Sequence, residues 1–229
     1  MTKGRFVTVQ AADGFKASAY RADPAAGGKG TVVVLQELFG VNRHIRKVCD
    51  NYAARGYTAL APALFDRVAP GVELGYGPED VRRGIELRDA QPVGLVLRDV
   101  QAAIDVLRLT GRVGVVGFCW GGTLAFLAAA RLSGLSAAVG YYGSMIPDFC
   151  EETPRVPVLL HFGAKDHTVP PNRLELVRQN RPDVEIEVYA AGHGFNCDER
   201  PGFDRALADL AFERTLSFLS RELSGGSHG

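Results

Sequence analysis

The sequence has no excess charge of either sign, because 26 lysine and arginine residues balance 26 acidic ones in a chain of 229 residues. A neutral chain gives no electrostatic reason to expect binding to nucleic acid or to an anionic membrane. The sequence also lacks any run close to the roughly 18 apolar residues that a membrane span requires. Its first ten residues, MTKGRFVTVQ, contain no apolar stretch typical of a secretory signal. We therefore expect a cytoplasmic, monomeric protein with neither a nucleic-acid nor a membrane partner.

Cysteine is scarce as well. Cys49, Cys119, Cys150 and Cys197 lie far apart, with no C-x-x-C pair and no metal-ligand spacing among them. In a chain of this size without a signal segment, such cysteines are expected to be free thiols in a reducing compartment. A composition of 46% hydrophobic and 23% charged residues is typical of globular proteins and suffices for a core without disulfide or metal. No metal is therefore expected, and each free thiol is a candidate nucleophile.

The sequence does contain an alternation of apolar runs and helical patterns. β-Branched runs indicate strands buried on both faces, and apolar residues three or four apart indicate helices. The expected strands are 31–36, 57–61, 112–118, 135–142, 158–162 and 184–189, and the expected helices are 44–55, 93–109, 121–131, 171–179 and 203–220. Residues 5–21 indicate a hairpin, and the Gly- and Pro-rich residues 63–80 a long surface loop. Repeated βα units predict a single α/β domain over 1–223, with a mainly parallel sheet flanked by helices, before a disordered tail at 224–229.

A strand-to-helix turn carries the first chemical motif, Gly117-Phe-Cys119-Trp120-Gly121. The pattern G-x-C-x-G between a strand and a helix is that of a nucleophile elbow, in which the turn lifts the central side chain clear of the sheet. At the N-terminus of a helix the dipole favours the thiolate of Cys119, the form that attacks a carbonyl carbon. The backbone N–H of Trp120 and that of Leu38, in the loop after strand 31–36, are candidate oxyanion donors. Two alternatives remain open: a buried apolar thiol, or a glycine-rich phosphate cradle, although the segment fits neither G-x-G-x-x-G nor a Walker loop.

Asp166 and His193 are the candidate acid and base, each lying directly after its own expected strand. The imidazole of His193 can take a thiol proton near neutral pH, and Asp166 can accept its other N–H and fix the tautomer. The chain order of nucleophile, acid and base is that of the α/β-hydrolase fold. Asp166 has an alternative role as the cap of a turn. The three residues together predict a cysteine-nucleophile hydrolase.

The other histidines have ordinary structural explanations. His161 lies inside an apolar strand and is expected to be a hydrogen-bonded core residue. His44 can cap its helix, His167 is expected to point away from the acid, and His228 lies in the tail. His193, flanked by glycines and preceded by a strand, is the histidine best placed to act as a base.

Several stretches in collinear order resemble the dienelactone hydrolase family. They are Gln36-Glu37-Leu38-Phe39-Gly40-Val41-Asn42, Gly117-Phe-Cys119-Trp-Gly-Gly, Gly140-Tyr141-Tyr142-Gly143, Gly163-Ala-Lys-Asp166-His167 and Gly192-His193-Gly-Phe195. The resemblance implies an α/β-hydrolase fold and hydrolysis of a small-molecule ester or enol-lactone through an acyl-cysteine, without metal or organic cofactor. It also implies that Glu37 contacts the resting thiol and moves when substrate binds. An exposed loop carboxylate is the alternative for Glu37.

Substrate recognition is implied by the same resemblance. The segment Leu64-Phe-Asp-Arg67-Val-Ala-Pro-Gly resembles the family segment whose arginine grips a substrate carboxylate, and Tyr141 is expected to line the pocket. The chain departs from the family pattern after His193, where Cys197 occupies the position of a second carboxylate-binding arginine. Arg200 is the candidate replacement. A solvated surface arginine at Arg67 and a core tyrosine at Tyr141 are the alternatives.

Two rival functions follow from these residues. The first is a broader esterase or thioesterase with the same triad, acting on substrates without a carboxylate. The second is a noncatalytic, redox-sensing protein in which Cys119 is oxidised. An intact His193 and Asp166 argue against the second, because thiol signalling needs neither. The roles of Cys49, Cys150 and Cys197 stay open.

Overall fold

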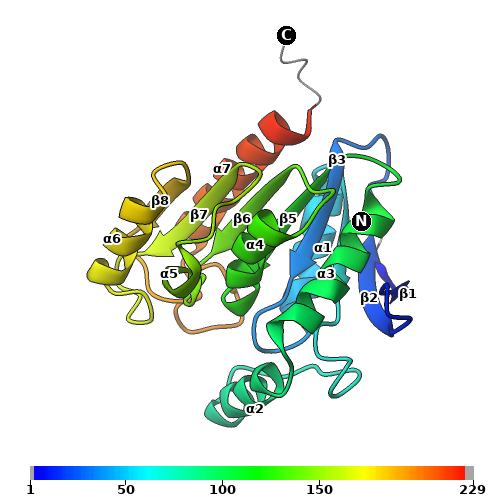
Figure 1. Cartoon of the computed structure of the whole chain (residues 1–229), viewed down its shortest axis with the longest axis horizontal. Coiled ribbons are helices and arrows are strands. Elements are labelled where there is room, and N and C mark those ends of the chain that lie inside the picture. The colour runs from blue at the N-terminus through cyan, green and yellow to red at the C-terminus, as the bar shows by residue number, and fades with distance from the viewer. Residues whose placement is uncertain (1–2, 225–229) are drawn as a thin grey trace.

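The computed structural model describes residues 3–224 and shows an α/β fold built on one eight-stranded sheet (Figure 1). The spatial order of the strands is β1-β2-β4-β3-β5-β6-β7-β8. The strands are β1 (Arg5–Gln10), β2 (Lys16–Ala22), β3 (Gly30–Leu35), β4 (Tyr57–Pro62), β5 (Val113–Phe118), β6 (Ala137–Tyr141), β7 (Val158–Gly163) and β8 (Glu185–Tyr189). Strands β1 and β2 pair antiparallel with each other and β2 with β4, whereas all other pairs are parallel. The predicted fold, a mainly parallel sheet flanked by helices, is confirmed.

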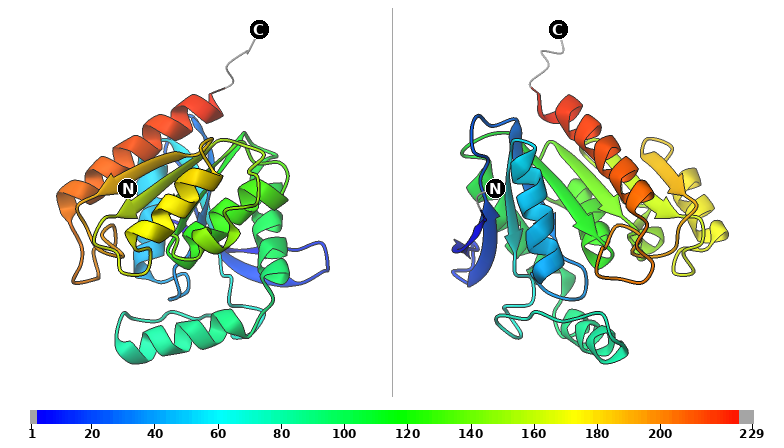
Figure 2. Two further views of the ribbon diagram at one scale, coloured as in Figure 1. Left: turned by 60° about the vertical axis from the view of Figure 1, so that its left-hand side comes forward. Right: turned by 180° about the vertical axis from the view of Figure 1, so that it is seen from behind.

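Helices cover both faces of this sheet. The main ones are α1 (Arg43–Ala54), α2 (Pro78–Asp89), α3 (Val93–Leu107), α4 (Trp120–Arg131), α6 (Pro171–Asn180) and α7 (Arg205–Leu223), with a short α5 (Ile146–Phe149). Helices α1 and α7 lie on one face and α3, α4 and α6 on the other, as the two opposite views in Figures 1 and 2 show. Successive apolar side chains of β3 point to opposite faces of the sheet and contribute to the core on each side. Val32 and Val34 pack with α1 and α7, while Val33 and Leu35 pack with α3 and α4.

The segment 63–80 differs from the expected surface loop. Leu64 and Phe65 are fully buried, and helix α2 begins within the segment at Pro78. The helix starts there because proline suits the first helical turn and the Asp80 carboxylate accepts a hydrogen bond from the Gly77 N–H at 3.1 Å. Its apolar periodicity is weak, since Gly84 and Leu87 are its buried residues. That weakness explains why the pattern alone did not predict α2.

The ends of α1 and α7 are fixed by side chains that the pattern only partly identified. Asn42 caps α1 by accepting a hydrogen bond from the Ile45 N–H at 3.2 Å, so the predicted capping role of His44 is wrong. Asp204 caps α7 in the same manner through the Leu207 N–H at 3.1 Å. Of the expected tail, Ser224 ends α7 and residues 225–229 lie outside the described residues. No helix in the described part of the chain is both long and apolar enough to cross a membrane.

Candidate active site

The candidate site lies at the carboxyl edge of the sheet, where parallel strands end side by side. Residue pairs Leu35–Gly117 and Phe118–Tyr141 place the ends of β3, β5 and β6 in register. The pair Gly163–Tyr189 does the same for β7 and β8. Loops that follow these strands therefore meet at one edge, which is where open α/β sheets bind their ligands.

Cys119 occupies a strained turn between β5 and α4. Its backbone has φ 53° and ψ −116°, a region that side-chain-bearing residues rarely adopt. Its N–H donates to the Tyr141 carbonyl at 2.9 Å, and its carbonyl accepts from the Gly122 N–H at 2.9 Å. These bonds hold the thiol at the N-terminus of α4, as the G-x-C-x-G pattern predicts. Cys119 is 9% exposed.

The glycines of the motif permit the close approach of three chain segments. A Cβ at Gly117 would lie 1.8 Å from the Gly121 carbonyl oxygen, and one at Gly121 would lie 2.4 Å from that of Leu35. Both distances are far shorter than any atomic contact allows, and both neighbours are backbone atoms. The turn therefore requires glycine at both positions, and it brings α4 against the end of β3.

Three side chains from separate loops form a hydrogen-bonded line. The distance from His193 Nε2 to Cys119 Sγ is 3.2 Å, and that from His193 Nδ1 to Asp166 Oδ2 is 2.8 Å. The other oxygen of Asp166 accepts from the Thr168 hydroxyl at 2.7 Å and from the Thr168 N–H at 2.9 Å. Asp166 is 3% exposed and is therefore a buried, fully hydrogen-bonded carboxylate. The arrangement is that of a nucleophile, a base and an orienting acid.

Charge within this line favours a protonated imidazole. Burial opposes the charge on His193, but the attraction of a Cys119 thiolate, with help from Asp166, raises the pKa of His193 to about 10. Burial also opposes the charge on Asp166, and its hydrogen bond to His193 is the main reason that the pKa of Asp166 is nevertheless lowered. The site thus favours a protonated imidazole next to Cys119 Sγ, and such a group can give its proton to a leaving oxygen.

The candidate oxyanion donors lie in the turns that follow β5 and β3. Trp120 is the first residue of α4, where the N–H has no acceptor within the helix. Leu38 lies in the turn after β3, and a Cβ at Gly84 would come 2.3 Å from its carbonyl oxygen, so α2 packs directly on this turn. The indole of Trp120 stacks on Phe65 with the ring centroids 5.3 Å apart. Both N–H groups remain candidates.

Glu37 is paired with an arginine rather than with the thiol. It is 1% exposed, and its Oε1 lies 3.3 Å from Nη1 of Arg200. The expected contact between Glu37 and a resting Cys119 thiol is not among the hydrogen bonds of residues 3–224. A guanidinium stabilises a buried carboxylate, whereas a neighbouring thiolate would repel it. Arg200 does reach the site, as the candidate replacement for the arginine missing at position 197.

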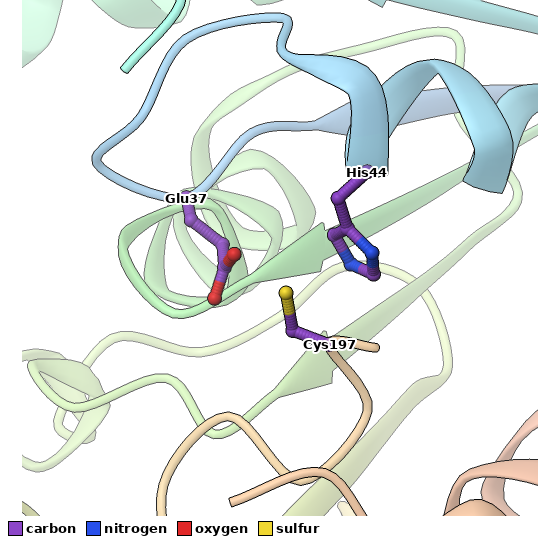
Figure 3. Close-up of side chains that lie close together, drawn as sticks. All are labelled: Glu37, His44 and Cys197. Atoms are coloured by element: carbon purple, nitrogen blue, oxygen red, sulfur yellow. The ribbon is translucent and has the colours of Figure 1, made fainter. Parts of the chain in front are cut away.

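A buried polar cluster adjoins Glu37 and was missed by the sequence analysis (Figure 3). It adds His44, at the start of α1, and Cys197, in the loop after β8, and both are buried. The Nδ1 atom of His44 lies 3.1 Å from Oδ1 of Asp198. Burial, together with the Glu37 charge, raises the pKa of Cys197 to about 12. No local pattern links residues 37, 44 and 197, so spacing along the chain gave no signal.

The tyrosine next to His193 is Tyr142 rather than Tyr141. The ring centroids of Tyr142 and His193 are 5.0 Å apart, and Tyr142 is held at φ 39°. The hydroxyl of Tyr141 instead bonds to the Thr215 hydroxyl at 2.6 Å and the Ala211 carbonyl at 3.1 Å, in the core under α7. Tyr141 is the last residue of β6, so its side chain follows the strand alternation into the core, and the next residue faces the site. The core alternative for Tyr141 therefore holds.

Arg67 does not join the triad. Its Nε and Nη2 atoms lie 2.8 and 2.7 Å from the two oxygens of Asp99, in a bidentate pair, and a second ion pair joins Arg67 to Asp13 at 3.0 Å. The guanidinium also lies 4.3 Å from the ring centroid of Phe15. The role expected from the resemblance, contact with a substrate carboxylate, stays a prediction. These pairs engage Nε and Nη2, so a substrate carboxylate at Arg67 would have to bind Nη1 or compete with Asp99 and Asp13.

Two further histidine predictions are confirmed. His161 is fully buried and bonds to the Tyr189 hydroxyl at 2.8 Å and the Thr215 hydroxyl at 2.9 Å. Its burial lowers the pKa of His161 to about 3. His167 is exposed, next to the buried Asp166.

Comparison with known proteins decides the family. The model of the dienelactone hydrolase family matches residues 17–223, nearly the whole chain. The chain belongs to the dienelactone hydrolase family. Carboxymethylenebutenolidase of Pseudomonas putida is 35% identical over 233 residues, covering 96% of this chain and 97% of that protein. Carboxymethylenebutenolidase 1 of Cupriavidus pinatubonensis is 30% identical over 224 residues, covering 93% and 95%.

Solved structures agree with this assignment. A structure from Klebsiella pneumoniae, ascribed to a dienelactone hydrolase, has a TM-score of 0.85 at 31% identity and covers 95% of this chain and 98% of that chain. A dienelactone hydrolase-like promiscuous phosphotriesterase from metagenomic libraries has a TM-score of 0.77 at 21% identity, covering 97% and 100%, and supports the fold alone. Membership of the family makes the protein a carboxylic-ester hydrolase that acts on small-molecule esters or lactones.

Proposed function

We propose that this hydrolase cleaves carboxylic esters, with an enol-lactone of the dienelactone type as its leading substrate, through an acyl-cysteine at Cys119. One observation carries the proposal: the line from Cys119 Sγ through His193 to Asp166, with distances of 3.2 and 2.8 Å. The raised pKa of His193, about 10, favours an imidazolium, and its positive charge next to Sγ favours a thiolate at Cys119.

Acylation follows from the charges of this pair. The Cys119 thiolate forms a bond to the carbonyl carbon, and the carbonyl oxygen becomes an oxyanion that the Trp120 and Leu38 N–H groups face, each worth about 3–4 kcal/mol. When the intermediate collapses, the bond between the carbonyl carbon and the leaving oxygen breaks. The imidazolium of His193 gives its proton to that oxygen, so the imidazole becomes neutral.

Deacylation restores the resting charges. Neutral His193 takes a proton from water, and the hydroxide oxygen bonds to the thioester carbon. The carbon–sulfur bond then breaks, releasing the carboxylic acid and leaving a thiolate beside an imidazolium. Asp166 stabilises the imidazolium in both halves of the cycle through its bond to Nδ1.

Arg200 is the cation that we assign to a substrate carboxylate, because it lies at the site with its side chain 23% exposed. A substrate carboxylate would compete with Glu37 for this guanidinium and would thereby free Glu37 to move. A broader esterase or thioesterase is the second candidate. It is favoured by the ion pairs that engage Arg67 and by Cys197 at the second arginine position.

The chemistry is tested by trapping the intermediate. The purified chain is mixed with an aryl acetate and quenched in acid, and the acetyl group is located by peptide mass mapping. We expect acetylation at Cys119 and complete loss of turnover in Cys119→Ala. Cys150→Ala, which removes a buried thiol elsewhere, is the matched control and should keep both. An acetyl group on another residue, or turnover by Cys119→Ala, would refute the assignment.

The substrate class is tested with a dienelactone carboxylic acid and its methyl ester, followed by loss of the dienelactone absorbance. If a carboxylate is recognised, Arg200→Met should raise KM for the acid by about tenfold or more and leave KM for the ester nearly unchanged. Equal KM values for acid and ester in the wild type would instead support the broader esterase. A panel of aryl esters and acyl thioesters then ranks the remaining substrates.

A further inference from the structure

Three side chains that ligate transition metals converge beside the triad. They are Glu37, His44 and Cys197, with exposed fractions of 1%, 3% and 0%. One donor atom of each, a carboxylate oxygen, an imidazole nitrogen and a sulfur, lies within 4.8 Å of the other two. Figure 3 shows the sulfur between the carboxylate and the imidazole.

Two of these groups carry lone pairs without a hydrogen bond. Glu37 Oε2 and His44 Nε2 are both buried and have no partner among residues 3–224. Buried polar atoms are nearly always paired, so two orphans in one cluster require an explanation. A bound ligand that accepts both lone pairs at once would explain why neither atom has a hydrogen-bond partner.

The orientation of His44 matches that of a metal-bound imidazole. Its Nδ1 lies 3.1 Å from Asp198 Oδ1, and Asp198 is itself held by an ion pair with Lys47. A carboxylate that accepts the Nδ1–H leaves the Nε2 lone pair free. Carboxylates orient ligating histidines in this manner in many metal sites.

We propose that Glu37, His44 and Cys197 form a binding site for a thiophilic divalent cation, with Zn²⁺ as the preferred ion. Binding displaces the thiol proton of Cys197 to the solvent, so that one thiolate and one carboxylate neutralise the two charges of the ion. Sulfur, nitrogen and oxygen lie about 2.0–2.3 Å from zinc, which sets the ligand atoms roughly 3.3–3.8 Å apart. Side-chain shifts of about an ångström reach that spacing, and a water completes the tetrahedron. Hard ions such as Mg²⁺ are disfavoured, because they select oxygen ligands.

The catalytic pair offers a competing thiol and imidazole, so the experiment must separate Cys119 from Cys197. The full-length protein is treated with chelator and titrated with Co²⁺ alone, whose tetrahedral thiolate complex absorbs in the near ultraviolet and the visible. Zn²⁺ is then added to displace the cobalt. We expect one equivalent of Co²⁺ per chain in the wild type and in Cys119→Ser, and its displacement by one equivalent of Zn²⁺.

Variants within the cluster give the decisive comparison. Cys197→Ser and His44→Phe should lose the thiolate band, and Cys150→Ser, a matched buried thiol, should keep it. Asp198→Asn keeps all three ligands and should weaken the affinity for the metal by about 10- to 100-fold. This variant tests the site even if a variant of a ligand fails to fold. The proposal is overturned by a wild type that binds no cobalt, by a band that survives Cys197→Ser, or by a band that disappears in Cys119→Ser.

Discussion

Removal of Arg200 should destabilise the protein more than removal of its partner Glu37. The two charges lie 3.3 Å apart, and their side chains are 23% and 1% exposed, respectively. At an effective dielectric of about 20 their attraction amounts to about 5 kcal/mol, which the desolvation of both groups partly offsets. Arg200→Met leaves a carboxylate buried without a partner, and we expect a loss of about 3 kcal/mol. Glu37→Gln leaves an arginine that water can still reach, and should cost only about 1 kcal/mol.

Urea unfolding followed by circular dichroism, in buffer that contains a chelator, measures both variants and their combination. For a chain of this length 3 kcal/mol corresponds to a fall in Tm of roughly 6–12 °C. The double variant Glu37→Gln/Arg200→Met should recover most of that loss, and Arg200→Lys, which keeps the charge, should lose less than Arg200→Met. Additive effects of the two single variants, within about 0.5 kcal/mol, would show that the ion pair does not stabilise Glu37.

Three further predictions concern the histidines. Asp166→Asn should keep the fold but lower kcat by ~10²–10⁴-fold, because the imidazole loses its tautomer control; steady-state ester hydrolysis measures this. Turnover should decline as pH rises through about 10, where the imidazolium of His193 loses the proton that the leaving oxygen needs; an alkaline limb unchanged in Asp166→Asn would contradict this origin. His161 stays neutral in the folded state down to about pH 3, but in the unfolded chain it is protonated below about pH 6.5. The free energy of unfolding should therefore decrease by up to about 1.4 kcal/mol for each unit by which the pH is lowered from 6.5 to 3. The slope of unfolding free energy against pH should be smaller in His161→Gln, and equal slopes would exclude this histidine as the cause.

The sequence predicted the parallel sheet and the triad because both depend on local patterns. Buried strands appear as continuous apolar runs, and Cys119 and Asp166 follow such runs, whereas His193 follows the edge strand β8, which alternates polar and apolar residues. Parallel strands end at one edge, so residues that follow them must converge. The distances of 3.2 and 2.8 Å within the triad agree with that reasoning.

Contacts between loops that are far apart in the sequence could not be predicted from local patterns. Glu37 and Arg200 are 163 residues apart, and His44 and Asp198 are 154 apart, with no periodicity to link them. The pairing of Arg67 with Asp99 was not predicted, because a loop arginine gives no indication of which carboxylate it will meet in space. Helix α2 was missed because its surface is nearly all polar, and its packing on Leu38 depends on the tertiary position of Gly84.

Trp120 is an intrinsic fluorophore at the turn between β5 and α4. It is the single tryptophan of the sequence, it directly follows Cys119, and its indole stacks on the buried Phe65. Emission excited at the red edge of the absorption spectrum therefore comes from one ring next to Cys119, the proposed nucleophile. Stopped-flow fluorescence can time the arrival and departure of an acyl group without any added dye, for every substrate whose product does not itself absorb there.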